Sequence, residues 1–457
     1  MRVLKLKQYA LVTILLLTAA ILSGCGLGLD RTGGGGGGGT GGGGGNTTGM
    51  EQVNHIIFMI QENRSFDHYF AKINEYRQSQ GLGADVDELP AGVTNPRVPD
   101  YAPVGSFHLQ TMCIENTSAA WYVSHQNFNL FNISSDNPTM DGFVWSAGGA
   151  ASFEGDQDTA GVRAMGYYDQ NDLPYYYFMA TQFGTSDRWF SPAPAETEPS
   201  KMYLVAATSA GHAHKPSQPV NVPTIFSALD SANITWKIYY ENNASDAILN
   251  YFQPYASQHQ ANFAPIAQYF TDVANGTLPQ VVMIEPGFGS DDEHPGLGNH
   301  IQVGAKKVSD LINALMTGPS WKDSVFIVTF DENGGMYDHV PPPTNVPSPD
   351  GIKPIDLFTK DVDGYDDPPG DFTRYGFRVP LIVVSPFSKK NYVAHTVTDS
   401  TAILRFIETR FKLPALTKRD AAASDMTEFF DWTNKPWATP PTPPAQPTNG
   451  PCYDGLP

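Results

Sequence analysis

Ile56-Ile57-Phe58-Met59-Ile60-Gln61-Glu62-Asn63-Arg64-Ser65-Phe66-Asp67 is an apolar run that turns abruptly polar and acidic. The same change occurs once more, where the run of residues 325–330 is followed by Asp331-Glu332-Asn333-Gly334-Gly335. An unbroken apolar run of this length, bounded by polar and turn residues, is typical of a strand buried on both faces, as in parallel α/β sheets. The two stretches therefore predict neighbouring buried strands.

The acidic residues after each predicted strand indicate a shared site. In open parallel sheets, ligands bind beyond the carboxyl ends of the strands. Adjacent carboxylates there repel one another unless a cation or a positive substrate group neutralises them. We interpret the two motifs as two halves of one metal site. Taken singly, Glu62-Asn63-Arg64 also fits a helix N-cap with a local ion pair, and residues 331–335 also fit a plain turn.

The remaining periodicity predicts the α/β class, with a mainly parallel central sheet flanked by helices on both faces. Further strands are expected at residues 234–240, 281–284 and 381–384. Helices are expected around residues 308–316, ended by Gly318, from Thr224-Ile225 onward, and over residues 403–411 with Asp399 or Ser400 as the cap. Residues 74–175 and 341–375 are expected to be long insertions over the active-site face. We predict one catalytic domain, residues 50–436.

The two ends of the chain carry different signals. Residues 1–24 have a basic start and a short apolar stretch, as in an export signal. They end in Leu22-Ser23-Gly24-Cys25, which resembles the lipobox of bacterial lipoproteins and implies acylation at Cys25; an ordinary secretory signal is the alternative. Residues 25–49 are glycine-rich and are predicted to be a flexible tether. The proline-rich residues 437–457 are expected to be a strap or a disordered tail.

Charge and cysteine content limit the partners and the compartment. The net charge of −19 argues against a nucleic-acid-binding surface and against tight adsorption to anionic lipid. Three cysteines suit an exported protein, and we expect a lipoprotein facing the periplasm or the cell exterior. With Cys25 assigned to the lipid anchor, Cys113 and Cys452 remain, and the sequence leaves open whether they pair.

A nucleophile candidate lies before another helical run. Thr197-Glu198-Pro199-Ser200-Lys201 precedes residues 202–207, and proline is well tolerated in a first helical turn. Thr197 is thus expected at the helix N-terminus, where N–H groups and the helix dipole favour anions. A hydroxyl held there beside a cation has a lowered pKa and can attack phosphorus. The alternative is that Thr197 is only a helix cap.

The motifs resemble those of a known enzyme family. The stretch from Glu62 to Phe70 resembles the first signature of the bacterial phospholipase C and acid phosphatase family of phosphoesterases, within the alkaline-phosphatase superfamily. Residues 331–343 resemble its second signature, and residues 376–380 its third. Met140-Asp141-Gly142-Phe143 and residues 397–413 are similar as well. The resemblance implies an alkaline-phosphatase-like fold over nearly all of residues 53–430.

The resemblance also implies roles for individual residues. One divalent metal ion would be held by Glu62, Asn63, Asp331 and Glu332, with Thr197 as fifth ligand and nucleophile; calcium, magnesium and manganese all suit oxygen ligands. Thr197 would form a phosphothreonine that water then hydrolyses. Asn63, His125 and His294 would bind substrate, and the two histidines would also act in catalysis by protonating the leaving alcohol. His212 and His339 are weaker candidates.

The chain departs from the family pattern at three places. Asn333 stands where the family has histidine, Ala119 where relatives often have a second histidine, and Ser200-Lys201 where Asn-Arg is common. No proposed metal ligand is lost, but the substrate preference and the pH optimum are left open.

These observations predict a metal-dependent phosphoesterase of the phospholipase C type, whose substrate is a phospholipid. An acid phosphatase acting on small soluble phosphate esters is the alternative. A non-catalytic surface lipoprotein is a second alternative, disfavoured because all five proposed ligands are present. A sulfatase is disfavoured by Thr197, since the sulfatases of the superfamily convert cysteine or serine at this position and threonine cannot serve. The sequence does not determine the oligomeric state.

Overall fold

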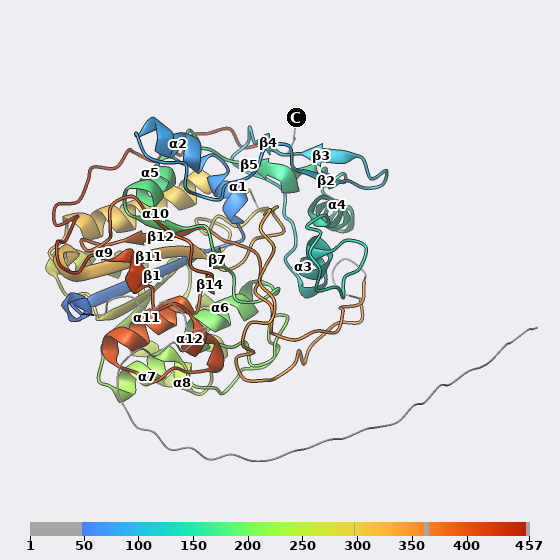
Figure 1. The fold of residues 1–457 in the computed structure, drawn as a ribbon. Coiled ribbons are helices and arrows are strands. Elements are labelled where there is room, and N and C mark those ends of the chain that lie inside the picture. Colours follow the sequence, from blue (N-terminus) through green and yellow to red (C-terminus); the bar gives the residue numbers. More distant parts are fainter. Residues whose placement is uncertain (1–47, 297, 361–364, 454–457) are drawn as a thin grey trace, which may run out of the picture. The chain divides into compact units, whose positions relative to one another are not determined.

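A single eight-stranded sheet forms the centre of the computed structural model, which describes residues 48–296, 298–360 and 365–453 (Figure 1). One of its two middle strands is β1 (His55–Gln61), which pairs in parallel with both β11 (Ser324–Phe330) and β10 (Val281–Glu285). Two further parallel strands continue the sheet beyond β10, namely β8 (Trp236–Tyr240) and β9 (Phe263–Pro265). The two predicted neighbouring strands are therefore confirmed as β1 and β11.

Beyond β11 the sheet is mixed. β12 (Leu381–Val384) runs antiparallel to β11, and β6 (Gly184–Ser186) runs antiparallel to β12. β13 (Tyr392–Ala394) then pairs in parallel with β6 at the edge. The expectation of a mainly parallel sheet holds for the half that carries both acidic motifs.

Helices cover both faces of this sheet, which confirms the predicted α/β class. Figure 1 shows α2 (Ile73–Ser79), α5 (Pro174–Gln182) and α10 (Ile301–Thr317) on one face. The other face carries α6 (Thr197–Ala206), α7 (Ile225–Ser231), α8 (Tyr255–Gln258), α11 (Ala402–Phe411) and α12 (Lys418–Ala422). α9 (Ile266–Asn275) follows β9 and packs against α10. Strands covered in this way bury both faces, so β1 shows apolar side chains without alternation.

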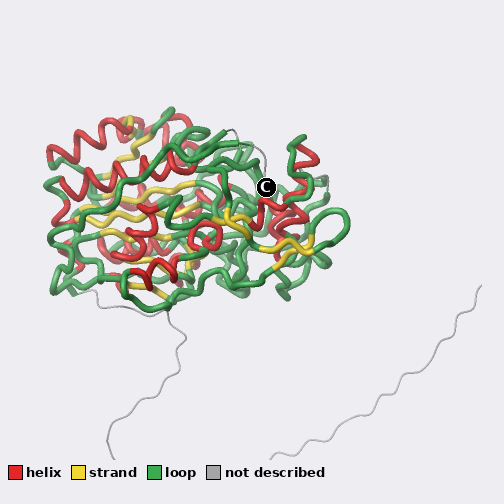
Figure 2. Tube along the Cα trace, turned by 90° about the horizontal axis from the view of Figure 1, so that it is seen from above, coloured by secondary structure: helices red, strands yellow, loops and turns green. Residues whose placement is uncertain are grey.

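The predicted insertions lie beyond the carboxyl ends of β1 and β11, and loops dominate that end of the molecule (Figure 2). The first contains α3 (Trp121–Phe128) and α4 (Phe143–Glu154). Short strands pair within it as β2 (Thr94–Pro96) with β3 (Pro103–Gly105), and as β4 (Phe107–His108) with β5 (Gly166–Tyr167). α1 (Phe66–Phe70) connects β1 to this region. The described part of residues 341–375 contains neither a helix nor a strand.

Two element boundaries differ from the expected ones. β8 begins at Trp236 and not at residue 234. α11 is preceded by Thr401, and neither Asp399 nor Ser400 is its cap. Asp399 is engaged elsewhere: it lies in β14 (Thr398–Asp399), which pairs with β7 (Trp189–Phe190), and its carboxylate accepts from Arg419 at 3.0 Å.

The C-terminal residues form a strap on the domain, which settles the alternative left open by the sequence for residues 437–453. Trp437 is buried, and its carbonyl accepts from the Trp321 indole at 3.0 Å. Further on, Gln446 is buried and donates to the carbonyl of Asp172. A disulfide joins Cys452 to Cys113, 339 positions away. The two cysteines that the sequence left unassigned therefore pair.

The predictions for the N-terminus fall outside the described residues. These are the export signal of residues 1–24, the acylated Cys25 and the glycine-rich tether as far as residue 47. In the part of the chain that the structure describes, no helix is both long and apolar enough to cross a membrane.

Replacing both Cys113 and Cys452 by serine is expected to lower the free energy of unfolding by about 2–5 kcal/mol, because the cross-link restricts the unfolded chain. Urea unfolding of the oxidised proteins measures the difference. Reductant should lower the stability of the unsubstituted protein to that of the double variant and leave the variant unchanged. Equal stability of the two oxidised proteins would contradict the prediction.

Candidate active site

The carboxylate of Asp331 joins the ends of the two central strands. Asp331 follows β11, and its backbone N–H donates to the carbonyl of Gln61 at the end of β1. Its Oδ1 accepts from the backbone N–H of Asn63 at 3.0 Å and from that of Glu332 at 2.8 Å. Asn63 has a φ of 66°, the left-handed conformation that asparagine tolerates better than most residues. The two motifs predicted to share a site are thus hydrogen-bonded to each other.

Thr197 approaches Asn63 from α6, one of the helices that cover the sheet. It is the first residue of α6, preceded by Glu196 as the N-cap. Its hydroxyl lies 3.3 Å from Oδ1 of Asn63, to which it donates. The placement at a helix N-terminus agrees with the sequence, and the hydrogen bond to Asn63 brings the proposed nucleophile to the proposed metal ligands.

Buried acidic groups surround this contact. Glu62, Asp331 and Glu332 are all buried, and so are Glu285 at the end of β10 and Asp292 in the following loop. One ammonium group offsets them: Nζ of Lys201, one turn after Thr197 on α6, lies 2.5 Å from Glu62 and 4.0 Å from Glu285. Burial would lower the pKa of Lys201, but these carboxylates raise it above its ordinary value. Of these five carboxyl groups, Glu62 and Glu285 pair with Lys201.

Because acidic groups are crowded and buried here, the pKa values of several of them are raised. Burial, and then repulsion from Glu62, raises the pKa of Asp331 to about 7 and that of Asp292 to about 7. Burial and the neighbouring Asp331 raise the pKa of Glu332 well above its ordinary value. Oε2 of Glu62 and Oδ2 of Asp331 are buried without a hydrogen-bond partner. Unpaired carboxylate oxygens and uncompensated negative charge fit a hard divalent cation at these residues.

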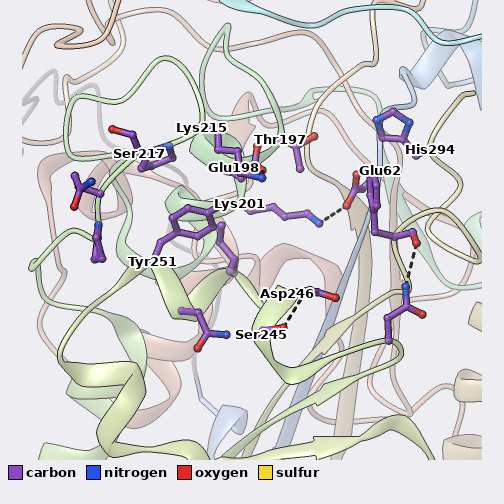
Figure 3. A pocket seen from close by; sticks show the side chains of 17 residues that line it. Glu62, Thr197, Glu198, Lys201, Lys215, Ser217, Ser245, Asp246, Tyr251 and His294 are labelled. Atoms are coloured by element: carbon purple, nitrogen blue, oxygen red, sulfur yellow. Dashed lines mark hydrogen bonds and ion pairs between the residues drawn. The ribbon is translucent and has the colours of Figure 1, made fainter. Parts of the chain in front are cut away.

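A pocket of about 760 Å³ opens beside Thr197. Figure 3 shows Glu62, Lys201, Thr197 and His294 along one side of it. Its lining also includes neutral hydrogen-bonding groups and three further charged side chains, namely Ser217, Gln218, Asn242, Ser245, Asn250, Glu198, Lys215 and Asp246. Nδ1 of His294 lies 2.5 Å from the carbonyl of Pro295, and burial lowers the pKa of this histidine below its ordinary value. The structure therefore brings His294 together with Thr197 and Glu62.

His125 lies elsewhere. It is buried on α3, its Nδ1 lies 2.7 Å from the carbonyl of Trp121, and burial lowers its pKa to about 4. It lines a different pocket, together with Asp136, Gly370 and Arg374. The structure does not bring His125 to Thr197, and its catalytic role stays a prediction. His212 pairs with Asp356 at 2.8 Å and is likewise not among the residues that line the Thr197 pocket.

The three signature motifs meet in a buried ion-pair network. Arg378, from the third motif, donates to Asp338 of the second and to Asp67 of the first, each at 2.9 Å. His339 contacts Asp67 at 2.8 Å and Asp87 at 3.2 Å. Arg378, Asp67 and Asp338 are almost completely buried. The guanidinium thus neutralises two carboxylates that would otherwise destabilise the fold.

Two groups of three possible metal ligands, among the described residues, have ligand atoms within 4.8 Å of one another. One is Asp67, Asp338 and His339, whose carboxylates already bind Arg378. The other is His108, Asp169 and Asp172 near β4. Neither group contains a ligand predicted from the sequence, so the predicted metal site depends on the unpaired oxygens described above.

Sequence reasoning missed several residues of this site. Glu285 follows the predicted strand of residues 281–284, so the rule that sites lie beyond strand ends could have identified it. Lys201 lies four positions after Thr197 and therefore shares its helix face. Arg378 was noted within a motif, but the sequence carries no sign that it pairs with Asp67 and Asp338.

Fold and site together define an α/β enzyme, with a hydroxyl nucleophile candidate and clustered carboxylates at the ends of parallel strands. A model of the phosphoesterase family matches residues 53–414. The chain belongs to the phosphoesterase family, and it is a hydrolase that acts on phosphoric ester bonds. The alternative of a non-catalytic binding lipoprotein is thereby set aside.

Among curated proteins, the chain is similar to phospholipase C B of Mycobacterium tuberculosis, with 30% identity over 89% of this chain and 82% of that protein. It is also 29% identical to non-specific phospholipase C1 of Arabidopsis thaliana, over 84% of this chain and 72% of the other. A solved protein of the alkaline phosphatase superfamily from Vibrio parahaemolyticus has a TM-score of 0.35 at 10% identity, over 78% of each chain. A structural similarity this low does not bear on function.

Replacing Arg378 by methionine is expected to destabilise the protein by about 3–5 kcal/mol, because Asp67 and Asp338 would remain buried without a counter-charge. Urea unfolding measures the loss. Arg97→Met is the matched control: Arg97 pairs with Asp100, and the two side chains are 43% and 51% exposed, so that change should leave the free energy of unfolding nearly unchanged. Equal effects of the two substitutions would contradict the assignment.

Removing divalent cations is expected to make stability fall as the pH rises. The raised pKa values of Asp331 and Asp292 mean that folding favours their protonated forms. Their contribution is fully present below the unfolded pKa near 4 and is lost as the pH rises through about 7. A bound cation would instead stabilise the ionised forms.

Melting temperatures measured from about pH 5 to about pH 8, with chelator and with added calcium, magnesium or manganese, test this pH dependence. The difference in melting temperature between the metal-supplied and the chelated protein should widen as the pH rises. A gap that is constant or absent over that range would show that these carboxylates hold no cation.

Proposed function

We propose that the protein is a metal-dependent phospholipase C-type phosphoesterase that acts through a phosphothreonine at Thr197. The observation that carries the proposal is the position of the Thr197 hydroxyl. It lies at the start of α6, bonds to Asn63 and faces a pocket that also contains Glu62, Lys201 and His294. The phospholipases among its relatives support a phospholipid as substrate.

In this proposal Oγ1 of Thr197 attacks phosphorus and the bond from phosphorus to the diacylglycerol oxygen breaks. His294, which lines the pocket and whose pKa is lowered by burial, accepts the proton of the Thr197 hydroxyl and passes it to that leaving oxygen. Water then attacks phosphorus, the bond to Oγ1 breaks, and the phosphorylated head group leaves with Thr197 regenerated. The polar and charged lining of the pocket, which includes Lys215, Ser217 and Asp246, suits a hydrated head group better than an acyl chain.

The cation would be held by Glu62, Asn63, Asp331 and Glu332, with Thr197 beside it. When bound, it would lower the pKa of the Thr197 hydroxyl and offset negative charge on the phosphoryl oxygens. Lys201 fixes Glu62 through its 2.5 Å ion pair, and the N–H groups of Asn63 and Glu332 orient Asp331. The unpaired oxygens of Glu62 and Asp331 support this assignment.

We further propose export and anchoring through an acylated Cys25, as the N-terminal sequence predicts. The internal disulfide between Cys113 and Cys452 supports an oxidising compartment. Such an enzyme would meet phospholipid from outside the cytoplasm.

Thr197→Ala is expected to reduce hydrolysis by about 10³-fold or more, because no other hydroxyl occupies its position. Thr197→Ser, which keeps the hydroxyl, is the matched control and should retain measurable activity. The full-length protein would be assayed on phosphatidylcholine vesicles and on p-nitrophenyl phosphate, with and without chelator.

Chelator-sensitive release of phosphocholine that the alanine variant lacks would support the proposal. Hydrolysis of p-nitrophenyl phosphate alone would assign the protein as a phosphatase of soluble monoesters. Full activity of Thr197→Ala on either substrate would exclude the proposed nucleophile.

A further inference from the structure

An exposed group of aromatic side chains lies at the end of the molecule that carries the insertions. Tyr101, between β2 and β3, stacks on Trp145 of α4 with ring centroids 4.6 Å apart. It also stacks on Phe131, in the loop after α3, at 5.9 Å. Phe131 is 72% exposed and Tyr101 50% exposed. Figure 1 shows β2, β3, α3 and α4 together in this region.

The outer side of α4 extends this group. Trp145, Gly149 and Phe153 recur every four residues and so share one helix face. Phe153 is 65% exposed, and a side chain placed at Gly149 would meet no atom within 4 Å. Along the helix axis, Phe153 lies about 12 Å beyond Trp145. We call Tyr101, Phe131, Trp145 and Phe153 the aromatic face.

Two ion pairs lie beside the aromatic face, and the acidic Glu154 follows Phe153 in the chain. Arg97 pairs with Asp100, next to Tyr101 in the chain, at 3.1 Å. Arg374 pairs with Asp136, five residues after Phe131, at 2.8 Å. With both arginines neutralised and a net charge of −19, the face has little attraction for anionic lipid. Paired charges around amphipathic aromatic rings instead complement head groups that carry both signs.

The aromatic face adjoins the catalytic pocket through a second cavity. Glu154 and Gly155, which follow Phe153, line a pocket of about 580 Å³ together with Phe288 and His294. Phe288 and His294 also line the pocket that contains Thr197, and Phe288 is 56% exposed. The end of α4 and the exposed Phe288 therefore line one cavity, which shares Phe288 and His294 with the candidate active site.

We propose that the aromatic face docks on a bilayer of zwitterionic phospholipid and inserts its rings among the head groups. Large exposed apolar groups on a soluble domain mark interaction surfaces, and tryptophan and tyrosine favour the membrane–water boundary. Docking there would hold the two adjoining pockets at the head-group layer, where the ester to be cleaved lies. This inference rests on the proposed action on phospholipid, but its test does not require catalysis.

The test uses the full chain with Cys25→Ser, which prevents acylation, and Thr197→Ala, which prevents turnover. Phe131→Cys and Phe153→Cys are labelled separately with an environment-sensitive fluorophore. Lys322→Cys is the matched control, since Lys322 is 74% exposed and lies before β11, at the opposite end of the strands. On adding phosphatidylcholine vesicles, both test labels should brighten and shift to shorter wavelength, and the control label should not.

No shift at either test site, or an equal shift at Lys322→Cys, would overturn the proposal. A second measurement uses Phe131→Ser with Phe153→Ser, and Thr197 retained. Its hydrolysis of vesicles should fall about tenfold or more through lost binding, with hydrolysis of a soluble ester unchanged. Unchanged vesicle hydrolysis would overturn the proposal, and so would a dimer seen in sedimentation that this double variant abolishes, because the face would then bind a second copy.

Labels that shift in a protein that never cleaves phosphatidylcholine would support docking and contradict the phospholipase assignment. Cleavage of phosphatidylcholine without any label shift would support the phospholipase assignment and contradict docking. The two hypotheses are therefore separable.

Discussion

The side chain of Arg378 holds together four segments of the chain, around residues 67, 87, 187 and 338. It donates to Asp67 after β1 and to Asp338 after β11, and it also donates to the backbone carbonyls of Asp87 and Asp187. All of its charge is buried, so the free energy of removing it from water is offset only when these acceptors are in place. The loops that follow the two central strands thus have one arrangement in which their charges are balanced. The candidate active site lies next to this arrangement and depends on it.

The site itself shows the opposite electrostatic design. Around Thr197 the carboxylates of Glu62, Asp331, Glu332, Glu285 and Asp292 outnumber the single ammonium of Lys201. In the Arg378 network negative charge is matched within the fold, whereas here it is left in excess beside a pocket. A protein keeps such an excess where a ligand supplies the missing positive charge, because the unliganded fold is otherwise destabilised. The carboxylates of Asp67 and Asp338 bind Arg378, whereas Glu62 and Asp331 each keep one buried oxygen without a partner.

Local sequence predicted the parts of this protein that follow local rules. The strands at residues 56–60, 281–284 and 381–384 were found because apolar runs bounded by polar residues mark buried strands. The sequence places Thr197 at the start of a helix because Pro199, two residues later, is well tolerated in a first helical turn. The antiparallel direction of β12 and the separation of His125 from Thr197 were not foreseen, because long loops decide both and residue periodicity does not encode their path. The Cys113–Cys452 pairing stayed open for the same reason.

The position of β1 in the sheet has a consequence for how the chain is made. β1 is synthesised first among the sheet strands, yet its two partners begin at Val281 and Ser324. Until more than half of the polypeptide has been translated, both edges of this very apolar strand have no partner in the sheet, and nonlocal pairing of this kind is slow. A nascent chain in this state exposes an apolar strand with two unpaired edges, which is the kind of segment that aggregates and that chaperones bind. The order of the strands thus makes the finished fold inaccessible to a truncated chain.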